Sequence, residues 1–414
     1  MKVVVVLSLL TTGFVSASTA QGRDSLDVKI GQMLLIGFPG PQVDPQVLEE
    51  VRRGKVGSII IFEKNIPRTN SFAGLKKITW TYQQAAPIPL FICIDQEGGR
   101  VNRLKEKYGF PRSITAEAMG RAPTLDSARF YGEATAATLA GLGINLNFAP
   151  VVDLASNPNN PIIARYGRAF SAHEDSVAIL AAAFIKAHRK FNVLTSLKHF
   201  PGHGSSQADT HLGMADVTQL WEERELAPYQ ILIDSGYVDA IMTAHIVNRN
   251  LDPDGRPGTL SDKILQGILR QRLGYEGVIF SDDMQMHAIT RHYGLEEAIR
   301  LAIMAGVDIM TFSNNISGSA ERTVDKVHAV IRKMVEEGVI PQTRIDESFR
   351  RIMKLKQRLN DEDPRAALQR EIRALESSLK DAIEAVREVN QSLEEDEKVQ
   401  NEKTQRRAGR KNRQ

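Results

Sequence analysis

The chain has 414 residues, of which 42% are hydrophobic and 25% are charged, so it can bury a large core. Its formal net charge of +3 gives no whole-chain argument for binding nucleic acid. The single cysteine, Cys93, excludes an intramolecular disulfide and a cysteine-rich metal site. Because Cys93 lies inside an apolar run, we expect it to be a small buried core residue.

Residues 1–20 have the pattern of an export signal. Lys2 supplies a positive start, residues 3–10 form a short apolar stretch, and small residues precede Gln21. This stretch is shorter than the roughly 20 residues that a membrane span needs, and no later stretch is long enough. A buried N-terminal strand is the alternative interpretation. We expect a signal peptide, no membrane span, and a periplasmic or secreted protein.

Residues 24–358 alternate short apolar strands with helical segments. The predicted strands are 34–38, 57–62, 90–95, 144–149, 194–199, 240–245, 277–282 and 307–312, and the clearest helical patterns are 47–53, 127–142, 177–191 and 220–235. Several strands are nearly continuous apolar runs, as expected where both faces of a sheet are covered. Such alternation predicts an α/β fold, a (β/α)8 TIM barrel. A doubly wound open sheet is the alternative, but no Gly-x-Gly-x-x-Gly turn follows the first strand.

The residues after the barrel have a different character. A polar segment at 360–364 marks a domain boundary, and in 364–398 apolar residues recur in alternating steps of four and three. This spacing predicts a long heptad helix, a coiled coil through which the chain self-associates. Packing of the helix back onto the barrel would use the same spacing. We expect the basic segment 399–414 to be a disordered tail.

Polar residues end several predicted strands. Asp95, His199, His245 and Asp282 each stand at the C-terminal end of an apolar run. In a barrel these ends share one rim, and the loops beyond them build the active site. We therefore expect these side chains to lie together.

Two segments near this rim carry acid–base chemistry. Residues 198–204 (Lys-His-Phe-Pro-Gly-His-Gly) place a lysine and a histidine before a tight turn, where both can hold ligand hydroxyls. In the extended triplet 209–211, Asp209 and His211 point the same way, so the carboxylate can orient an imidazole that exchanges protons near neutral pH. The histidine spacing lacks the signature of zinc proteases, and we expect no metal.

Two acidic segments complete the candidate site. Asp282 ends a rigid strand and suits a nucleophile, whereas Asp283 would face the other way and cap the next helix. Upstream, Asp95 can accept hydrogen bonds and Arg103 can donate them. Two further cations, Arg100 and Arg168, either contact a ligand or pair with internal acids, and the sequence leaves both interpretations open.

Taken together, the motifs at 94–101, 198–204, 209–211 and 281–284 resemble those of family 3 glycoside hydrolases, and more narrowly its β-N-acetylhexosaminidase branch. The resemblance runs from about Lys29 to Lys356. It implies a retaining enzyme without a cofactor, with Asp282 as nucleophile and His211, held by Asp209, as acid/base. It also implies sugar contacts at five positions, which are Asp95, Arg103, Arg168, Lys198 and His199.

The chain departs from this pattern at two points near the dyad. Thr210 replaces a commoner serine, and Met214-Ala215 stands where Leu-Pro is usual. The second change puts the closing of the dyad loop in question, and with it the rate.

The expected function is removal of a terminal β-linked N-acetylglucosamine from peptidoglycan fragments or chitin-type oligosaccharides. Phosphate could replace water as acceptor, because an imidazolium does not repel an anion as a carboxylate would. A β-glucosidase of the same family generally lacks the dyad of Asp209 and His211. A non-catalytic wall-binding protein is the remaining alternative, and the presence of Asp282 and His211 argues against it.

Overall fold

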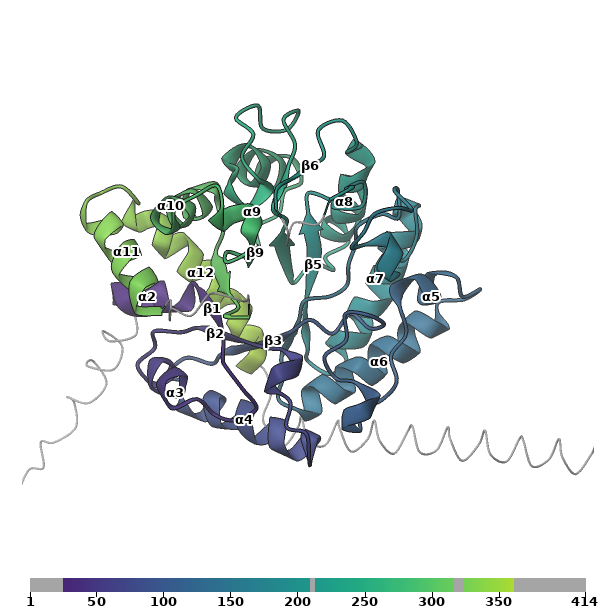
Figure 1. The fold of residues 1–414 in the computed structure, drawn as a ribbon, viewed down its shortest axis with the longest axis horizontal. Helices are drawn as coiled ribbons and strands as arrows, with labels where there is room; N and C mark the ends of the chain where they lie inside the picture. The colour runs from purple at the N-terminus through teal and green to yellow at the C-terminus, as the bar shows by residue number, and fades with distance from the viewer. Residues whose placement is uncertain (1–24, 209–212, 316–323, 361–414) are drawn as a thin grey trace, which may run out of the picture. The chain divides into compact units, whose positions relative to one another are not determined.

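The computed structural model describes residues 25–208, 213–315 and 324–360. Eight parallel strands close into a barrel in the order β1-β10-β9-β7-β5-β4-β3-β2, with helices outside it (Figure 1). The strands are β1 (Leu34–Gly37), β2 (Ser58–Ile61), β3 (Phe91–Ile94), β4 (Leu146–Asn147), β5 (Leu194–Phe200), β7 (Ala240–Thr243), β9 (Val278–Asp283) and β10 (Ile309–Phe312). The predicted (β/α)8 fold and all eight predicted strands are confirmed.

The helices follow the strands around the barrel. They are α2 (Leu26–Gln32), α3 (Pro45–Arg52), α4 (Ser71–Ala85), α5 (Ala116–Gly120), α6 (Asp126–Gly141), α7 (Glu174–Arg189), α8 (Ala227–Asp234), a wider π-helical segment (Lys263–Arg272), α9 (His287–Thr290), α10 (Leu295–Ala305), α11 (Val324–Glu336) and α12 (Gln342–Asn360). Short 3₁₀ turns occur at Glu63–Asn65, Glu106–Tyr108, Ala164–Tyr166, Glu223–Leu226 and Gly258–Leu260, and a small parallel pair joins β6 (Ala215–Asp216) to β8 (Ile246–Val247). No helix among the described residues is long and apolar enough to cross a membrane.

Local sequence signals explain where these elements begin. Asp44 accepts hydrogen bonds from the backbone N–H groups of Gln46 and Val47, and Pro45 starts α3 where no N–H is needed. The run Ser58–Ile61 is wholly buried and ends in β-branched isoleucines, which suits a strand covered on both faces. It pairs with β3 in register, Ser58 opposite Phe91 and Ile61 opposite Ile94.

Large aromatic side chains fill the barrel interior. The ring of Phe280 on β9 lies 5.2 Å from that of Phe148 and 6.3 Å from that of Phe91, centroid to centroid. β9 is not a neighbour of β3 or β4 in the barrel, so these rings meet across the interior and make it a packed core. Cys93 is buried in this core, as expected.

The N-terminal end of the barrel is held by a buried charge network. Asp308, just before β10, accepts hydrogen bonds from Arg270 (2.9 Å), Ser348 (2.7 Å) and the N–H of Ile279 (3.0 Å). Asp308 is fully buried. Because barrel enzymes carry their chemistry at the opposite end, we assign this network to stability.

A buried histidine behind β4 gives a testable pH dependence of folding. The Nδ1 of His188 lies 3.0 Å from the carbonyl oxygen of Phe184, and its Nε2 lies 3.1 Å from the amide of Asn147. Burial lowers the pKa of His188 to about 4. In the unfolded chain His188 is protonated below its ordinary pKa of about 6.5, whereas in the folded protein it is protonated only near pH 4. The folded state therefore loses stability relative to the unfolded state as the pH drops from 6.5 towards 4.

We expect the free energy of unfolding to fall by about 2 kcal/mol more in the wild type than in His188→Gln between pH 7 and pH 5. Glutamine keeps an acceptor for Asn147 but cannot be protonated in this range. Urea titrations at the two pH values give the comparison, and the exposed His173, changed to Gln, is the control. An equal pH dependence in wild type and His188→Gln would show that His188 does not titrate in this way.

Candidate active site

A cavity of about 310 Å³ lies at the C-terminal ends of the barrel strands. Its wall is built from the ends of β2, β3, β5, β7, β9 and β10 and from the loop after β4. Six residues expected from the sequence line it, which are Asp95, Arg103, Arg168, Lys198, His199 and Asp282. The other two, Asp209 and His211, lie outside the described residues, so their predicted roles stay predictions.

His245 does not line the cavity, so its expected place beside the other strand-end residues is wrong. Its strand, β7, ends at Thr243, and the imidazole turns into the protein. There its Nδ1 lies 2.7 Å from the Thr259 hydroxyl, and its Nε2 lies 3.0 Å from the carbonyl oxygen of Asp283. His245 therefore supports the end of β9 from behind.

Two carboxylates and three cations form a continuous network in the cavity wall. The Nζ of Lys198 lies 2.7 Å from an Asp95 oxygen and 2.6 Å from a Glu97 oxygen. Arg168 donates to both oxygens of Glu97, at 2.7 and 2.8 Å, and Arg103 donates to Asp95 at 3.3 Å. Such paired, charge-assisted contacts fix the direction of each side chain. The network therefore presents a rigid set of donors and acceptors to a ligand.

The charges of this network keep both carboxyl groups ionised at neutral pH. Burial alone raises the pKa of Asp95, but the nearby Lys198 and Arg103 outweigh it and hold the pKa below its ordinary value. Burial also raises the pKa of Glu97, and Arg168 and Lys198 more than reverse the effect. Glu97 is a site residue that the sequence analysis did not single out, although it stands inside the motif at 94–101.

The sequence left open whether Arg168 contacts a ligand or pairs with an internal acid. The structure is consistent with both, because its guanidinium pairs with Glu97 and Arg168 also lines the cavity. Arg100 behaves differently. No ion pair to a carboxylate joins it within the described part of the chain, and its guanidinium carbon lies 4.4 Å from the centre of the Tyr166 ring. The interpretation of Arg100 as part of an internal ion pair is therefore wrong.

His199 is held by a buried carboxylate that the sequence analysis also missed. Asp153, 1% exposed, accepts from His199 Nδ1 at 2.6 Å and from the backbone N–H groups of His199 and His203 at 3.2 and 2.8 Å. The His199 Nε2 lies 3.2 Å from a nitrogen of Arg168, which can only donate. This pair of contacts selects the neutral tautomer with its proton on Nδ1. His199 is thus a positioned contact residue, and its Nε2 accepts from Arg168.

We expect Asp153→Asn to lower kcat/KM by about a hundredfold, because the change disturbs the tautomer of His199. An asparagine that still accepts from the two backbone N–H groups turns its NH2 towards His199 Nδ1. That nitrogen must then accept, so the proton moves to Nε2 and faces the Arg168 donor. Kinetics on a nitrophenyl glycoside measure the loss, and a thermal melt within a few degrees of wild type separates it from unfolding. Activity within threefold of wild type would contradict this assignment.

Asp282 and Asp283 both line the cavity at the end of β9. An oxygen of Asp282 accepts from the N–H of Asp283 at 2.8 Å, and its own N–H points to the Thr243 hydroxyl at 3.4 Å. Asp283 accepts from the Ser313 hydroxyl and from the N–H of Gln285 at 3.1 Å. Burial raises the pKa of Asp283 to about 6. Asp283 is therefore held by neighbours in a structural role.

Two expectations about Asp283 are wrong. It lines the cavity beside Asp282 because the pairing of β9 with β10 shifts register between Phe280 and Asp283, which breaks the regular alternation of side chains. It also does not cap the following helix, since α9 begins at His287 and Met286 precedes it. Its bond to Gln285 closes a tight turn between strand and helix.

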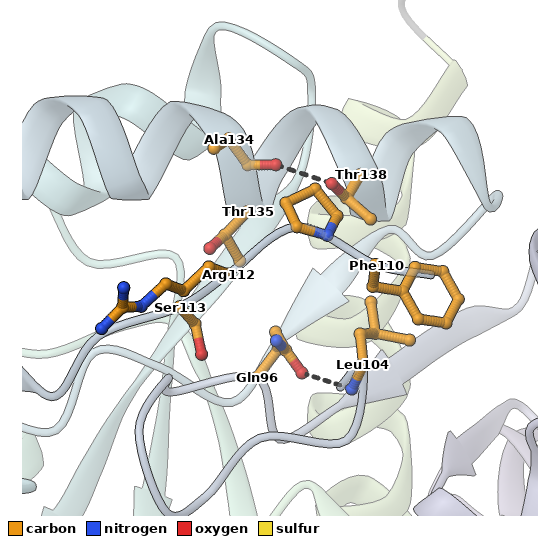
Figure 2. Close-up of a pocket in the computed structure, with 9 residues that line it drawn as sticks. Gln96, Leu104, Phe110, Arg112, Ser113, Ala134, Thr135 and Thr138 are labelled. Atoms are coloured by element: carbon orange, nitrogen blue, oxygen red, sulfur yellow. Dashed lines mark hydrogen bonds between the residues drawn. The ribbon is translucent and has the colours of Figure 1, made fainter. Parts of the chain in front are cut away.

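A second, smaller hollow lies between α6 and the loop through Phe110 and Ser113 (Figure 2). Its volume of about 10 Å³ is too small for a sugar, and it is bounded by α6 and the loop up to Ser113. The Gln96 side chain borders it and accepts from the backbone N–H groups of Arg103 (3.0 Å) and Leu104 (3.1 Å). The Gln96 amide also donates to Asn102 at 2.7 Å. This hollow is thus part of the support that positions Arg103.

The comparisons with known proteins agree with the geometry. Residues 25–355 match the family described as "Glycosyl hydrolase family 3 N terminal domain". The chain is 37% identical over 291 residues to a beta-hexosaminidase of Tolumonas auensis, covering 69% of this chain and 84% of that protein. It is 33% identical over 335 residues to beta-hexosaminidase A of Pseudoalteromonas piscicida, covering 76% of this chain and 55% of that protein.

Solved structures agree as well. A family 3 beta-N-acetylglucosaminidase from a Paenibacillus species matches with a TM-score of 0.74 at 34% identity, over 81% of this chain and 62% of that chain. A beta-N-acetylhexosaminidase from Beutenbergia cavernae matches with a TM-score of 0.72 at 27% identity, over 80% of this chain and 98% of that chain. With a family match across most of its length and with these relatives, this chain belongs to glycosyl hydrolase family 3.

Proposed function

We propose that the protein is an exo-acting, retaining β-N-acetylhexosaminidase that releases terminal β-linked N-acetylglucosamine. The observation that carries the proposal is the placement of the Asp282 carboxylate in the cavity that the Asp95, Glu97 and Lys198 network lines. A fixed nucleophile beside fixed hydroxyl-binding groups is what glycosyl transfer to an enzyme carboxylate requires. The names of the similar proteins support the choice of sugar.

The proposed reaction has two steps. Asp282 attacks the anomeric carbon, the bond to the leaving oxygen breaks, and His211, oriented by Asp209, gives that oxygen a proton. The product of this step is a glycosyl ester on Asp282. His211 then takes a proton from water, the water oxygen bonds to the anomeric carbon, and the ester bond breaks. Two inversions leave the product with the β configuration.

The remaining features of the proposal rest on sequence patterns. Peptidoglycan fragments and chitin-type oligosaccharides both carry the terminal sugar that the reaction needs. The pattern of residues 1–20 supports export to the periplasm or beyond. The heptad spacing of 364–398 supports self-association through a coiled coil. Both segments lie outside the described residues.

The test is hydrolysis of 4-nitrophenyl N-acetyl-β-glucosaminide compared with 4-nitrophenyl β-glucoside, with and without phosphate. We expect the acetamido sugar to be preferred and the first product seen by NMR to be the β-anomer. Faster cleavage of the glucoside would replace the proposal with a β-glucosidase. Formation of N-acetylglucosamine 1-phosphate would replace it with a phosphorylase.

A further inference from the structure

A buried glutamate lies directly behind the turn of residues 202–206, which follows β5. Glu225 belongs to the 3₁₀ turn Glu223–Leu226 that leads into α8, and it is 2% exposed. Its Oε2 accepts a hydrogen bond from the backbone N–H of Gly204 at 2.9 Å. At Gly202, where φ is +120°, an added Cβ would lie 2.7 Å from both the Cβ and the Oε2 of Glu225. Glu225 therefore both packs against this turn and bonds to it.

Two other buried side chains hold the remaining polar groups of the turn. Asp153 accepts from the backbone N–H of His203 at 2.8 Å. The side-chain amide of Asn160, which is fully buried, donates to the carbonyl oxygens of His203 (2.8 Å) and Gly204 (3.0 Å). Together with Glu225, these contacts occupy the N–H and C=O groups of both residues. The conformation of the turn is thus fixed by side chains, and Glu225 supplies the bond to Gly204.

The carboxyl group of Glu225 is held without a cation. Among the described residues no cation pairs with it. Burial, together with the charge of Asp153, raises its pKa to about 7, although Ser205 and Gly204 donate hydrogen bonds to it. Burying an acid without a cation costs free energy, so such a group is more typical of a functional site than of a core. Near pH 7 the group is partly neutral, and glutamine has the shape of that neutral form.

The place of the turn in the chain decides what Glu225 can influence. The predicted acid/base pair, Asp209 and His211, begins three residues after the end of the turn. The sugar-contact carboxylates are fixed differently, because Lys198 and Arg168 hold them from inside the cavity wall. A change at Glu225 should therefore affect proton transfer more than sugar binding.

We propose that Glu225 is a positioning residue for proton transfer to the leaving group. It accepts the hydrogen bond from Gly204 and so fixes the turn from which the chain runs to Asp209 and His211. This inference rests on the proposed function and adds to it a residue outside the cavity. Because the turn needs an acceptor oxygen, glutamine should replace Glu225, whereas methionine, which has a similar length but only a weak sulfur acceptor, should not.

The experiment compares two aryl glycosides that release the same sugar. The 2,4-dinitrophenolate ion is a weak base and departs without a proton, whereas phenolate needs one. The readout is the ratio of kcat/KM for phenyl N-acetyl-β-glucosaminide to kcat/KM for the 2,4-dinitrophenyl glycoside. Both values come from one preparation, so the ratio does not depend on how much of a variant is folded. We expect Glu225→Met to lower it about twentyfold, part of the roughly hundredfold or more that a positioned acid contributes.

Three variants serve as controls for this ratio. Glu225→Gln keeps the acceptor for Gly204 and should stay within threefold of wild type. Glu223 is an exposed glutamate of the same 3₁₀ turn, and Glu223→Ala removes the same charge, so we expect a ratio within twofold of wild type. His211→Ala removes the proposed acid itself and should lower the ratio more than Glu225→Met does.

The outcomes separate this inference from the proposed function. If His211→Ala lowers the ratio but Glu225→Met leaves it unchanged, the role of Glu225 is overturned and the hexosaminidase assignment stands. An equal fall in Glu225→Gln or in Glu223→Ala would also overturn it, since the acceptor oxygen would then not be the cause. An unchanged ratio in His211→Ala would overturn the proposed acid/base and this inference with it. If the wild type cleaves no glucosaminide at all, the proposed function fails first.

Discussion

Replacing Asp282 with alanine should lower kcat on 4-nitrophenyl N-acetyl-β-glucosaminide by about four orders of magnitude. The other carboxyl groups of the described cavity are engaged elsewhere, because Asp95 and Glu97 are paired with cations and Asp283 is held by Ser313 and Gln285. Asp282 is partly exposed at a strand end, so we expect the fold to tolerate the change. Added azide should restore part of the activity, since a small anion fits the space of the lost carboxylate and attacks the anomeric carbon. The product would then be the α-glycosyl azide.

The neighbouring Asp283 provides the control for this experiment. Its pKa of about 6 means that the carboxyl group gains a proton easily just below neutral pH, and asparagine has the shape of the protonated form. It is also held by Ser313 and Gln285. We expect Asp283→Asn to lose less than tenfold and to gain nothing from azide. A larger loss in Asp283→Asn than in Asp282→Ala would exchange the two assignments.

The barrel was predictable because its strands carry a strong local signal. Runs such as residues 59–61 are apolar throughout, and this pattern does not depend on which elements pack beside them. The least accurate boundary is that of β4, which pairs only over Leu146–Asn147 although the apolar run is longer. Single backbone bonds continue beyond Asn147, from the Phe148 N–H to Ile94 and from the Ser196 N–H to Ala149, but Pro150 has no N–H with which to extend the ladder.

The site was predictable where a polar residue ends a strand, and less so elsewhere. Asp95, His199 and Asp282 followed from that rule, because strand ends share one rim whatever the loops do. Glu97 contacts Lys198, 101 positions away, and Asp153 contacts His199, 46 positions away. Only the closed barrel brings these pairs together. His245 also follows an apolar run in the sequence, but its side chain does not line the cavity, because its ring bonds to the buried Thr259 hydroxyl instead.

The second large effect is expected for Lys198, which is 2% exposed between two carboxylates. Lys198→Met keeps the length of the side chain but leaves Asp95 and Glu97 with one cation fewer. Removing one partner from a buried ionic network costs about 3 kcal/mol or more, because the remaining charges lose their compensation. We expect this loss in the free energy of unfolding at pH 7, and a fall in kcat/KM of about a thousandfold as the ligand-binding groups lose their fixed geometry.

The pH dependence distinguishes this cause from a simple packing defect. Burial raises the pKa of Asp95, and in the wild type Lys198 and Arg103 outweigh that effect. Without Lys198 the pKa of Asp95 rises, so protonation relieves the unpaired charge and the stability difference from wild type shrinks as the pH falls from 7 to about 4.5. Lys105→Met, which removes a pair with Glu63 in which the lysine is 39% exposed, should cost less than about 1 kcal/mol. If the Lys198→Met difference is the same at both pH values, the carboxylates are not its source, and the packing of the methionine is.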